Sequence, residues 1–217
     1  MGINNIQNIR DGYKEFFELC SQEDFFRFGL SKIITIENDK IKEDWNKLKW
    51  NIENKGNDLY IRDFGRNGIG NSYLEMMYKD VFDISINFDP TNNTKPTQKI
   101  QKLTEYRKNK TIYNYQVSHI FGNTKNVYCF TAPWNIVFIP KILDPFTGHE
   151  AKGTYVNEFR NIFTKKYFEL FHDYIDDYHS LLKAIMPDVN NWINKNINEE
   201  RIKISILKEF KEIKNCI

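Results

Sequence analysis

The chain has few cysteines, and they lie far apart. Cys20, Cys129 and Cys216 are its three cysteines, and no two of them form a C-x-x-C pair. This spacing excludes a disulfide framework and a four-cysteine zinc site. Alanine is also rare, with three residues, whereas asparagine, isoleucine and lysine are abundant. The abundance of lysine is therefore part of a general compositional bias and does not by itself indicate nucleic-acid binding.

Long hydrophobic runs and a large net charge are absent too. No stretch approaches the roughly 18 consecutive apolar residues of a membrane span, and residues 1–5 contain no secretory hydrophobic segment. The 31 Lys and Arg residues nearly balance the 29 Asp and Glu residues, which excludes a histone-like excess of positive charge. The hydrophobic content of 41% is sufficient for a core. We expect a soluble, intracellular protein with no membrane span.

Helical periodicity dominates the first eighty residues and the last third. Apolar residues recur at helical spacing over 9–19, 25–30, 41–52 and 155–185, and we expect Pro187 to end the last of these runs. Shorter helices are expected over 72–81 and 199–214, and a strand over 83–88. His172 and Asp176 lie one turn apart, but two exposed groups alone make a poor metal site.

A glycine-rich segment interrupts the helical pattern at 62–71. Its glycines, Gly65, Gly68 and Gly70, fit neither the P-loop nor the dinucleotide-binding spacing, and no strand clearly precedes them. A surface turn is the simplest interpretation. The functional alternative is a loop beside DNA in which Arg62 and Arg66 contact phosphate.

Positive charge is concentrated between residues 95 and 126. Within this segment Glu105 is the single acid, and Pro96 is expected in the first turn of a helix. The basic residues are Lys95, Lys99, Lys102, Arg107, Lys108, Lys110 and Lys125. A solvated helix face is the common reason for such a run, and contact with phosphate is the alternative.

The most informative pattern follows this basic segment. Residues 113–122 alternate like a strand that carries His119 near its end, before a glycine and a polar loop. A second apolar run, 132–140, contains Asn135, and Asp144-Pro-Phe-Thr-Gly-His149-Glu comes after it. Asn135 follows His119 by 16 positions, and Asp144 follows Asn135 by 9.

This order of strand, loop, strand and helix resembles the HNH, or ββα-metal, nuclease family. The resemblance extends over about 40 of the 217 residues. At a finer level, three segments are similar to type II restriction endonucleases of this fold: Ser-His-Ile-Phe-Gly-x-Thr-Lys-Asn, Ala-Pro-Trp-Asn and Asp-Pro-Phe-Thr-Gly-His-Glu. The resemblance implies an α+β, predominantly helical protein built around a ββα-metal core.

The resemblance also implies a role for each residue of the motif. His119 would be the general base, since neutral imidazole suits proton abstraction near pH 7. The backbone carbonyl of Asn135 would accept from the other ring nitrogen, while the Asn135 side chain holds the loop. Asp144 would bind Mg²⁺ or Mn²⁺ through hard oxygen atoms, and His149 would be a second ligand or a phosphate contact. Ser118 occupies the position of an acidic or histidine ligand in many members, and a hydroxyl is a weak ligand.

The implied activity is sequence-specific hydrolysis of double-stranded DNA in the bacterial cytoplasm. A palindromic site would favour a homodimer. We assign residues 1–110 to a helical DNA-recognition region with a basic arm, and 111–217 to the catalytic core with C-terminal helices; one compact domain is the alternative. The expected DNA contacts are Lys125, Arg107, Lys108, Lys110 and Arg66.

Other functions stay open at this point. Ser118 favours a nucleic-acid-binding module with a degenerate HNH site, and a non-specific or RNA-directed nuclease is a variant of the enzyme. If the motif is fortuitous, the chain is a helical interaction protein. Taken singly, His119 could be a packed residue, Asn135 a cap and Asp144 a turn residue, and Trp134 is expected in the core rather than as a stacking platform.

Overall fold

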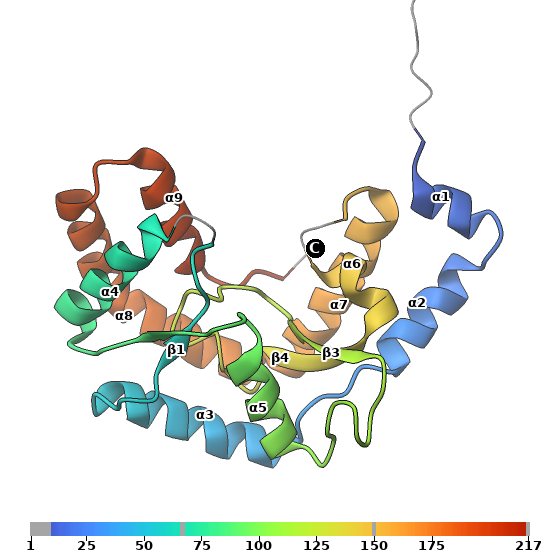
Figure 1. Ribbon diagram of the computed structural model, residues 1–217, viewed down its shortest axis with the longest axis horizontal. Helices are drawn as coiled ribbons and strands as arrows, with labels where there is room; N and C mark the ends of the chain where they lie inside the picture. Colours follow the sequence, from blue (N-terminus) through green and yellow to red (C-terminus); the bar gives the residue numbers. More distant parts are fainter. Residues whose placement is uncertain (1–9, 66–67, 149–150, 216–217) are drawn as a thin grey trace, which may run out of the picture.

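The computed structural model describes residues 10–65, 68–148 and 151–215, which form a mostly helical α+β structure with two small sheets (Figure 1). This confirms the predicted class at the level of α+β. In chain order the elements are α1 (Gly12–Phe17), α2 (Gln22–Ser31), α3 (Asn38–Glu53), β1 (Tyr60–Ile61), α4 (Ile69–Phe82), β2 (Asn87–Phe88), α5 (Thr94–Leu103), β3 (Tyr115–His119), β4 (Ile136–Pro140), the 3-10 helix η1 (Lys141–Leu143), α6 (Asp144–Thr147), α7 (Thr154–Leu170), α8 (His172–Asn196) and α9 (Glu200–Glu209).

The helices of the amino-terminal region form where the periodicity predicts them. The Asp11 side chain caps α1 by accepting from the backbone N–H of Tyr13 at 2.9 Å, and Ser21 caps α2 in the same way. In α3, the apolar residues at helical spacing are buried: Ile41, Trp45, Leu48 and Ile52. Burial of one face therefore decides the local structure of α3.

A short parallel sheet flanks the glycine-rich segment. β1 pairs with β2, and the segment 62–68 follows β1 directly, so the expectation that no strand precedes the glycines was wrong. Of the predicted strand 83–88, only Asn87 and Phe88 are extended in a ladder. Asp83 has a positive φ of 53° and ends α4, which leaves few residues for the strand.

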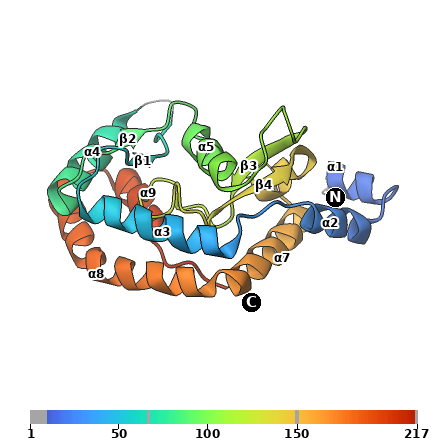
Figure 2. The ribbon, with the colours of Figure 1, turned by 90° about the horizontal axis from the view of Figure 1, so that it is seen from below.

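One hydrophobic core contains residues from both of the regions predicted from the sequence. Trp45 of α3 and Trp134, just before β4, meet edge to face with ring centroids 5.6 Å apart. Trp134 is fully buried, as expected, and every residue of β4 is buried. α5 and α6 pack against the β3–β4 hairpin, so the hairpin lies within this core (Figure 2).

The carboxy-terminal helices differ from the prediction in three places, one of which is that α9 ends at Glu209 rather than at residue 214. The chain bends at Phe171, which divides the expected long helix into α7 and α8 (Figure 2). Pro187 lies inside α8 rather than at its end. Proline removes one helical hydrogen bond, but the helix continues because Trp192 and Ile193 beyond it are buried and the Trp192 indole donates to Asp80 of α4 at 2.8 Å. Among the described residues, no helix is long and apolar enough to cross a membrane.

Candidate functional site

The β3–β4 hairpin carries the predicted motif. The two strands are antiparallel, and His119, the last residue of β3, pairs with Ile136, the first residue of β4. Loop 120–135 connects them, and helices α6 and α7 follow β4. His119 lies at a strand end, and the elements follow in the order strand, loop, strand and helix. Both agree with the expectation from the sequence.

The imidazole of His119 is oriented by a backbone carbonyl. Its Nε2 atom lies 2.8 Å from the carbonyl oxygen of Phe130, and its ring stacks on the Phe130 ring with centroids 5.5 Å apart. A carbonyl only accepts hydrogen bonds, so Nε2 carries the hydrogen and Nδ1 of the neutral ring has the free lone pair. Nδ1 bonds none of the described residues, and the residue as a whole is partly exposed. The ring is therefore held in one orientation against the loop.

The surroundings keep this ring uncharged at neutral pH. Burial lowers the pKa of His119 from 6.5 to about 4, and the nearby guanidinium of Arg62 also lowers it. The bond to Phe130 and the carboxylates of Glu209 and Asp89 have the opposite, smaller effect on this pKa. Neutral imidazole at physiological pH can accept a proton.

Asn135 holds loop 120–135 together. Its side chain is fully buried, and Nδ2 donates to the carbonyls of Gly122 and Cys129, each at 3.0 Å. Its Oδ1 accepts from the backbone N–H of Phe121 at 2.9 Å. All three contacts fix the loop, as the resemblance implies for this side chain.

The backbone carbonyl of Asn135 has a different role from the one expected. It accepts from the N–H of Ile120 at 2.9 Å and so extends the β-ladder by one residue. The partner of His119 is the carbonyl of Phe130 instead, because the loop folds back over the end of β3. No sequence signal distinguishes this carbonyl, since every residue has one.

Asn126 is a second buried amide that the sequence reasoning did not single out. Its Nδ2 donates to the hydroxyl of Tyr178 at 3.1 Å and to the carbonyl of Glu209 at 3.2 Å. Its Oδ1 accepts from the N–H of Tyr128 at 3.0 Å. Asn126 thus attaches the loop to α8 and to the end of α9. In the sequence it stands in a polar loop, where asparagine is common and carries no distinguishing signal.

The other side of β3 faces α6. The hydroxyl of Ser118 donates to that of Thr147 at 3.3 Å, whereas His119 points to the opposite face, as successive strand residues do. Asp144 begins α6, and its carboxylate forms no hydrogen bond or ion pair with any described residue. No hydrogen bond or ion pair joins His119 to Asp144 within the described ranges. His149 lies outside the described residues.

Among the described residues of α6 and the face of β3 that it covers, the groups able to bind a metal ion are oxygen donors. The available groups are the Asp144 carboxylate and the hydroxyls of Ser118 and Thr147. Nowhere in ranges 10–65, 68–148 and 151–215 do three or more His, Cys, Asp or Glu residues form a group able to hold a metal ion. A single carboxylate with hydroxyls suits weakly held Mg²⁺ or Mn²⁺, which commonly take further oxygens from water and phosphate. His172 pairs with Asp173 rather than with Asp176.

Most of the predicted DNA contacts are either engaged in other interactions or lie before the far end of β3 from His119. Lys125 forms an ion pair with Glu209 at 2.9 Å in which the two side chains are 15% and 13% exposed, so its charge is already paired. The guanidinium of Arg107 donates to carbonyls at the end of α5, including that of Thr104 at 2.8 Å. Lys108 and Lys110 precede β3 and are at the end of the strand opposite to His119. Arg66 lies outside the described residues.

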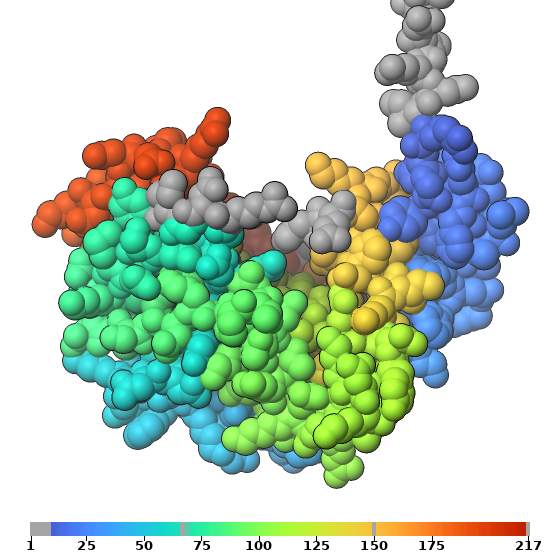
Figure 3. Space-filling model, in the orientation of Figure 1, coloured from blue at the N-terminus to red at the C-terminus, as the bar shows by residue number. Residues whose placement is uncertain are grey.

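Arg62 is the basic residue whose charge lowers the pKa of His119. Its backbone follows β1 and is held by a hydrogen bond from its N–H to the carbonyl of Thr124 at 2.9 Å. The side chain is exposed and has no ion pair or hydrogen bond with the described residues, yet its charge acts on the His119 ring. The space-filling view is hollowed between α4 and α9 on one side and α6 on the other (Figure 3). β3 and its loop contact both walls of this hollow: Ser118 bonds Thr147 of α6, and Asn126 bonds the carbonyl of Glu209 at the end of α9.

Comparison with known proteins places the chain in a family. The family model described as "Uncharacterised protein PM1201" matches residues 36–216. The chain belongs to the PM1201 family. It is similar to the "Uncharacterized protein PM1201" of Pasteurella multocida (strain Pm70), with 43% identity over 208 residues that cover 95% of this chain and 94% of the relative. No solved structure matches.

Proposed function

We propose that this PM1201-family protein is a metal-dependent DNA endonuclease of the HNH type, with His119 as general base. The observation that carries the proposal is the state of the His119 ring. The ring is neutral near pH 7, Phe130 fixes its orientation, and Nδ1 is free to accept a proton. It stands at the end of β3, in a β–β–α order that agrees with the resemblance.

In this proposal His119 acts on the attacking water. Nδ1 takes one proton from the water while the oxygen attacks phosphorus, and the phosphorus–oxygen bond to the leaving group breaks. The Nε2 hydrogen stays on its bond to Phe130, and that carbonyl stabilises the imidazolium as it forms. Glu209 and Asp89 favour the same charge. The base is thus neutral before the reaction, and these three groups offset part of the cost of protonation that burial and Arg62 impose.

The reaction also requires groups that stabilise the negative charge on the phosphate. The charge of the exposed Arg62 side chain acts on His119, and we propose that this guanidinium binds a phosphate oxygen of the DNA. Asp144 would hold Mg²⁺ or Mn²⁺ on the face of β3 towards α6, with Ser118 and Thr147 as weak neighbours and His149 as a second ligand or phosphate contact. Because His119 points to the opposite face, the phosphate would have to lie over the end of β3 to reach both the ion and the base. Such an ion, when bound, stabilises negative charge on the phosphate and the leaving oxygen.

Digestion of a long DNA of known sequence tests the proposal. Purified protein is incubated with the DNA in Mg²⁺ or Mn²⁺, and all fragment ends are sequenced. Discrete ends at one motif support a sequence-specific enzyme, and scattered ends support a non-specific one. Parallel incubation with RNA identifies the substrate. Absence of cleavage of both nucleic acids with either metal contradicts the proposal.

A binding module with a degenerate site is the second candidate. It is favoured by Ser118, whose hydroxyl bonds Thr147 where many HNH members have a stronger ligand. The same preparation separates the two candidates: a module retards DNA in a gel without cutting it, and retardation weakens steeply with salt.

A further inference from the structure

Residues 126–130 form a tight turn whose last carbonyl orients His119. The backbone N–H groups of Cys129 and Phe130 both donate to the carbonyl of Asn126, at 2.9 and 3.0 Å. The carbonyl of Phe130, at the end of this turn, is the one that Nε2 of His119 bonds. The orientation of the imidazole therefore depends on where the turn lies.

A single buried side chain binds both this turn and the carboxy-terminal helices. Asn126 is fully buried, and its Oδ1 caps the turn by accepting from the N–H of Tyr128 at 3.0 Å. Its Nδ2 donates outwards, to the hydroxyl of Tyr178 on α8 at 3.1 Å and to the carbonyl of Glu209 at the end of α9 at 3.2 Å. Both hydrogens and the oxygen of this amide are thus bonded.

The elements that Asn126 bonds belong to the core. Tyr178 is buried, and so are Ile206 of α9 and Phe210 just after it. Helices α8 and α9 lie together at one end of the molecule (Figure 1). The Glu209 carboxylate also holds the residue before Asn126, since Oε2 accepts from the backbone N–H of Lys125 at 3.0 Å. The turn is therefore attached to a rigid part of the structure.

The other contacts of the loop do not duplicate this attachment. The three side-chain bonds of Asn135 all stay within loop 120–135. The hydroxyl of Tyr78 on α4 bonds the backbone on either side of Asn126, at the carbonyl of Lys125 and the N–H of Val127, but not the later part of the turn. Among these side chains, Asn126 both caps the turn and connects it to α8 and α9.

We propose that Asn126 is a positioning residue for His119: it fixes turn 126–130 to α8 and α9, and the carbonyl of Phe130 then sets the direction of the imidazole. Asn126 is uncharged, so it acts on the ring through the position of the turn and not through a charge. The consequence for DNA cleavage rests on the proposed function, whereas the state of the ring is measured on the protein alone.

Nuclear magnetic resonance of the histidine rings tests the proposal without DNA. The chain has four histidines, and the His119 signal is the one absent from His119→Ala. Burial is the largest cause of the depressed pKa of His119 and outweighs the opposite effect of the bond to Phe130. Asn126→Ala loosens the turn and is therefore expected to raise the titration midpoint from about 4 towards 6.5, by about half a pH unit or more. The Nε2 hydrogen should exchange with water about tenfold faster or more.

A milder variant and a matched control accompany Asn126→Ala. Tyr178→Phe removes only the hydroxyl that Nδ2 of Asn126 bonds, and both measures are expected to change in the same direction by a smaller amount. Asn123→Gly is the control, because the Asn123 amide also bonds the Tyr178 hydroxyl at 3.4 Å and the carbonyl of Lys211 at 3.0 Å. Within the described residues it bonds no part of the turn, and glycine suits the positive φ of 51° at this position.

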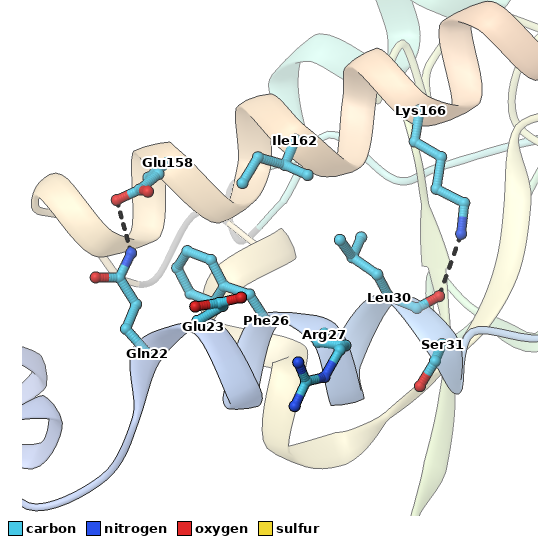
Figure 4. A pocket seen from close by; sticks show the side chains of 9 residues that line it. All are labelled: Gln22, Glu23, Phe26, Arg27, Leu30, Ser31, Glu158, Ile162 and Lys166. Carbon is cyan, nitrogen blue, oxygen red and sulfur yellow. Dashed lines mark hydrogen bonds between the residues drawn. The ribbon is translucent and has the colours of Figure 1, made fainter.

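Gln22→Ala is a control remote from the turn. The Gln22 amide joins α2 to α7 by donating to Glu158 at 2.8 Å (Figure 4). Helix α2 lies at the opposite end of the molecule from α9 (Figure 1). This variant shows whether any broken bond between helices disturbs the His119 ring. Both controls are expected to keep the wild-type midpoint and exchange rate.

Cleavage assays separate this proposal from the proposed function. Asn126→Ala is expected to lower kcat about tenfold or more while KM stays within about twofold, because the buried Asn126 does not reach DNA. A wild-type midpoint and exchange rate in both Asn126→Ala and Tyr178→Phe, or an equal change in the controls, overturns the positioning role whether or not the protein cuts DNA. If the ring responds as expected but the wild type cleaves neither DNA nor RNA, the positioning role is supported and the nuclease function is contradicted.

Discussion

The Nε2 atom of His119 and the carbonyl oxygen of Phe130, 2.8 Å apart, determine which nitrogen of the imidazole is free to act. Because Nε2 donates to this carbonyl, Nδ1 of the neutral ring carries the free lone pair. His119→Ala is therefore expected to reduce DNA cleavage by about 10²–10⁴-fold while leaving DNA affinity within twofold, which a plasmid-nicking assay and a gel-shift titration measure. His172→Ala removes an exposed histidine of α8 and is the control. Wild-type cleavage by His119→Ala would exclude His119 as the base.

The depressed pKa of His119 also predicts a pH dependence of stability. In the folded protein the pKa is about 4, and in the unfolded chain it is near 6.5, so the unfolded chain binds more protons between these values. Unfolding free energy is therefore expected to rise with pH over this range and to fall as the solution is acidified from 6.5 towards 4. The contribution is at most about 3 kcal/mol and is smaller where solvent reaches the ring. Urea titrations of wild type and His119→Ala at pH 4.5 and 7 isolate this contribution, and the unfolding free energy of the variant should change less between the two pH values. An equal change in both proteins would show that the ring titrates normally.

Asn135 is expected to contribute mainly through the loop that it closes. Asn135→Ala removes three hydrogen bonds to the backbone of Phe121, Gly122 and Cys129, of which the one to Cys129 is buried. Each such loss costs about 1 kcal/mol, and the unsatisfied groups cost more, so the unfolding free energy should fall by about 3 kcal/mol. Asn161→Ala, on an exposed position of α7, is the control and should change it by less than about 0.5 kcal/mol. Equal stability of the two variants would mean that loop 120–135 does not need this clamp.

The sequence predicts the hairpin well because its signals are local. Alternation over residues 113–122 places His119 at a strand end, and the spacing to Asn135 defines the connecting loop. The hydrogen bonds of the Asn135 side chain also join residues that are close in sequence. Its role in holding loop 120–135 could therefore be inferred from the resemblance to the HNH motif.

Features that depend on distant contacts could not be predicted in this way. Lys125 is paired with Glu209, which is 84 positions away, and no local pattern shows that its charge is neutralised. Pro187 fails to end a helix because tertiary contacts of Trp192 outweigh the lost hydrogen bond. Arg62 influences the pKa of His119 because a hydrogen bond to Thr124 brings the end of β1 against loop 120–135, a contact that periodicity does not encode.

Asp144 provides a test of the metal proposal. Its carboxylate has no partner among the described residues, so Asp144→Asn is expected to leave the fold intact and to raise the Mg²⁺ concentration for half-maximal cleavage by about tenfold or more. Asp188→Asn, at an exposed position of α8, is the control. Ser118→Asp should have the opposite effect, because it supplies a second carboxylate on the face towards α6. An unchanged Mg²⁺ titration in Asp144→Asn would remove this residue from the site.

Arg62 and Lys110 differ in position although both are exposed and basic. Arg62 acts on the charge of His119, whereas Lys110 lies before the opposite end of β3. Arg62→Ala is expected to weaken cleavage by about tenfold or more, while Lys110→Ala retains the wild-type rate. Loss of the guanidinium also raises the pKa of His119, so the acidic limb of the pH–rate profile of Arg62→Ala should move to higher pH. An identical limb in both variants, or an equal loss of rate, would separate Arg62 from the His119 site.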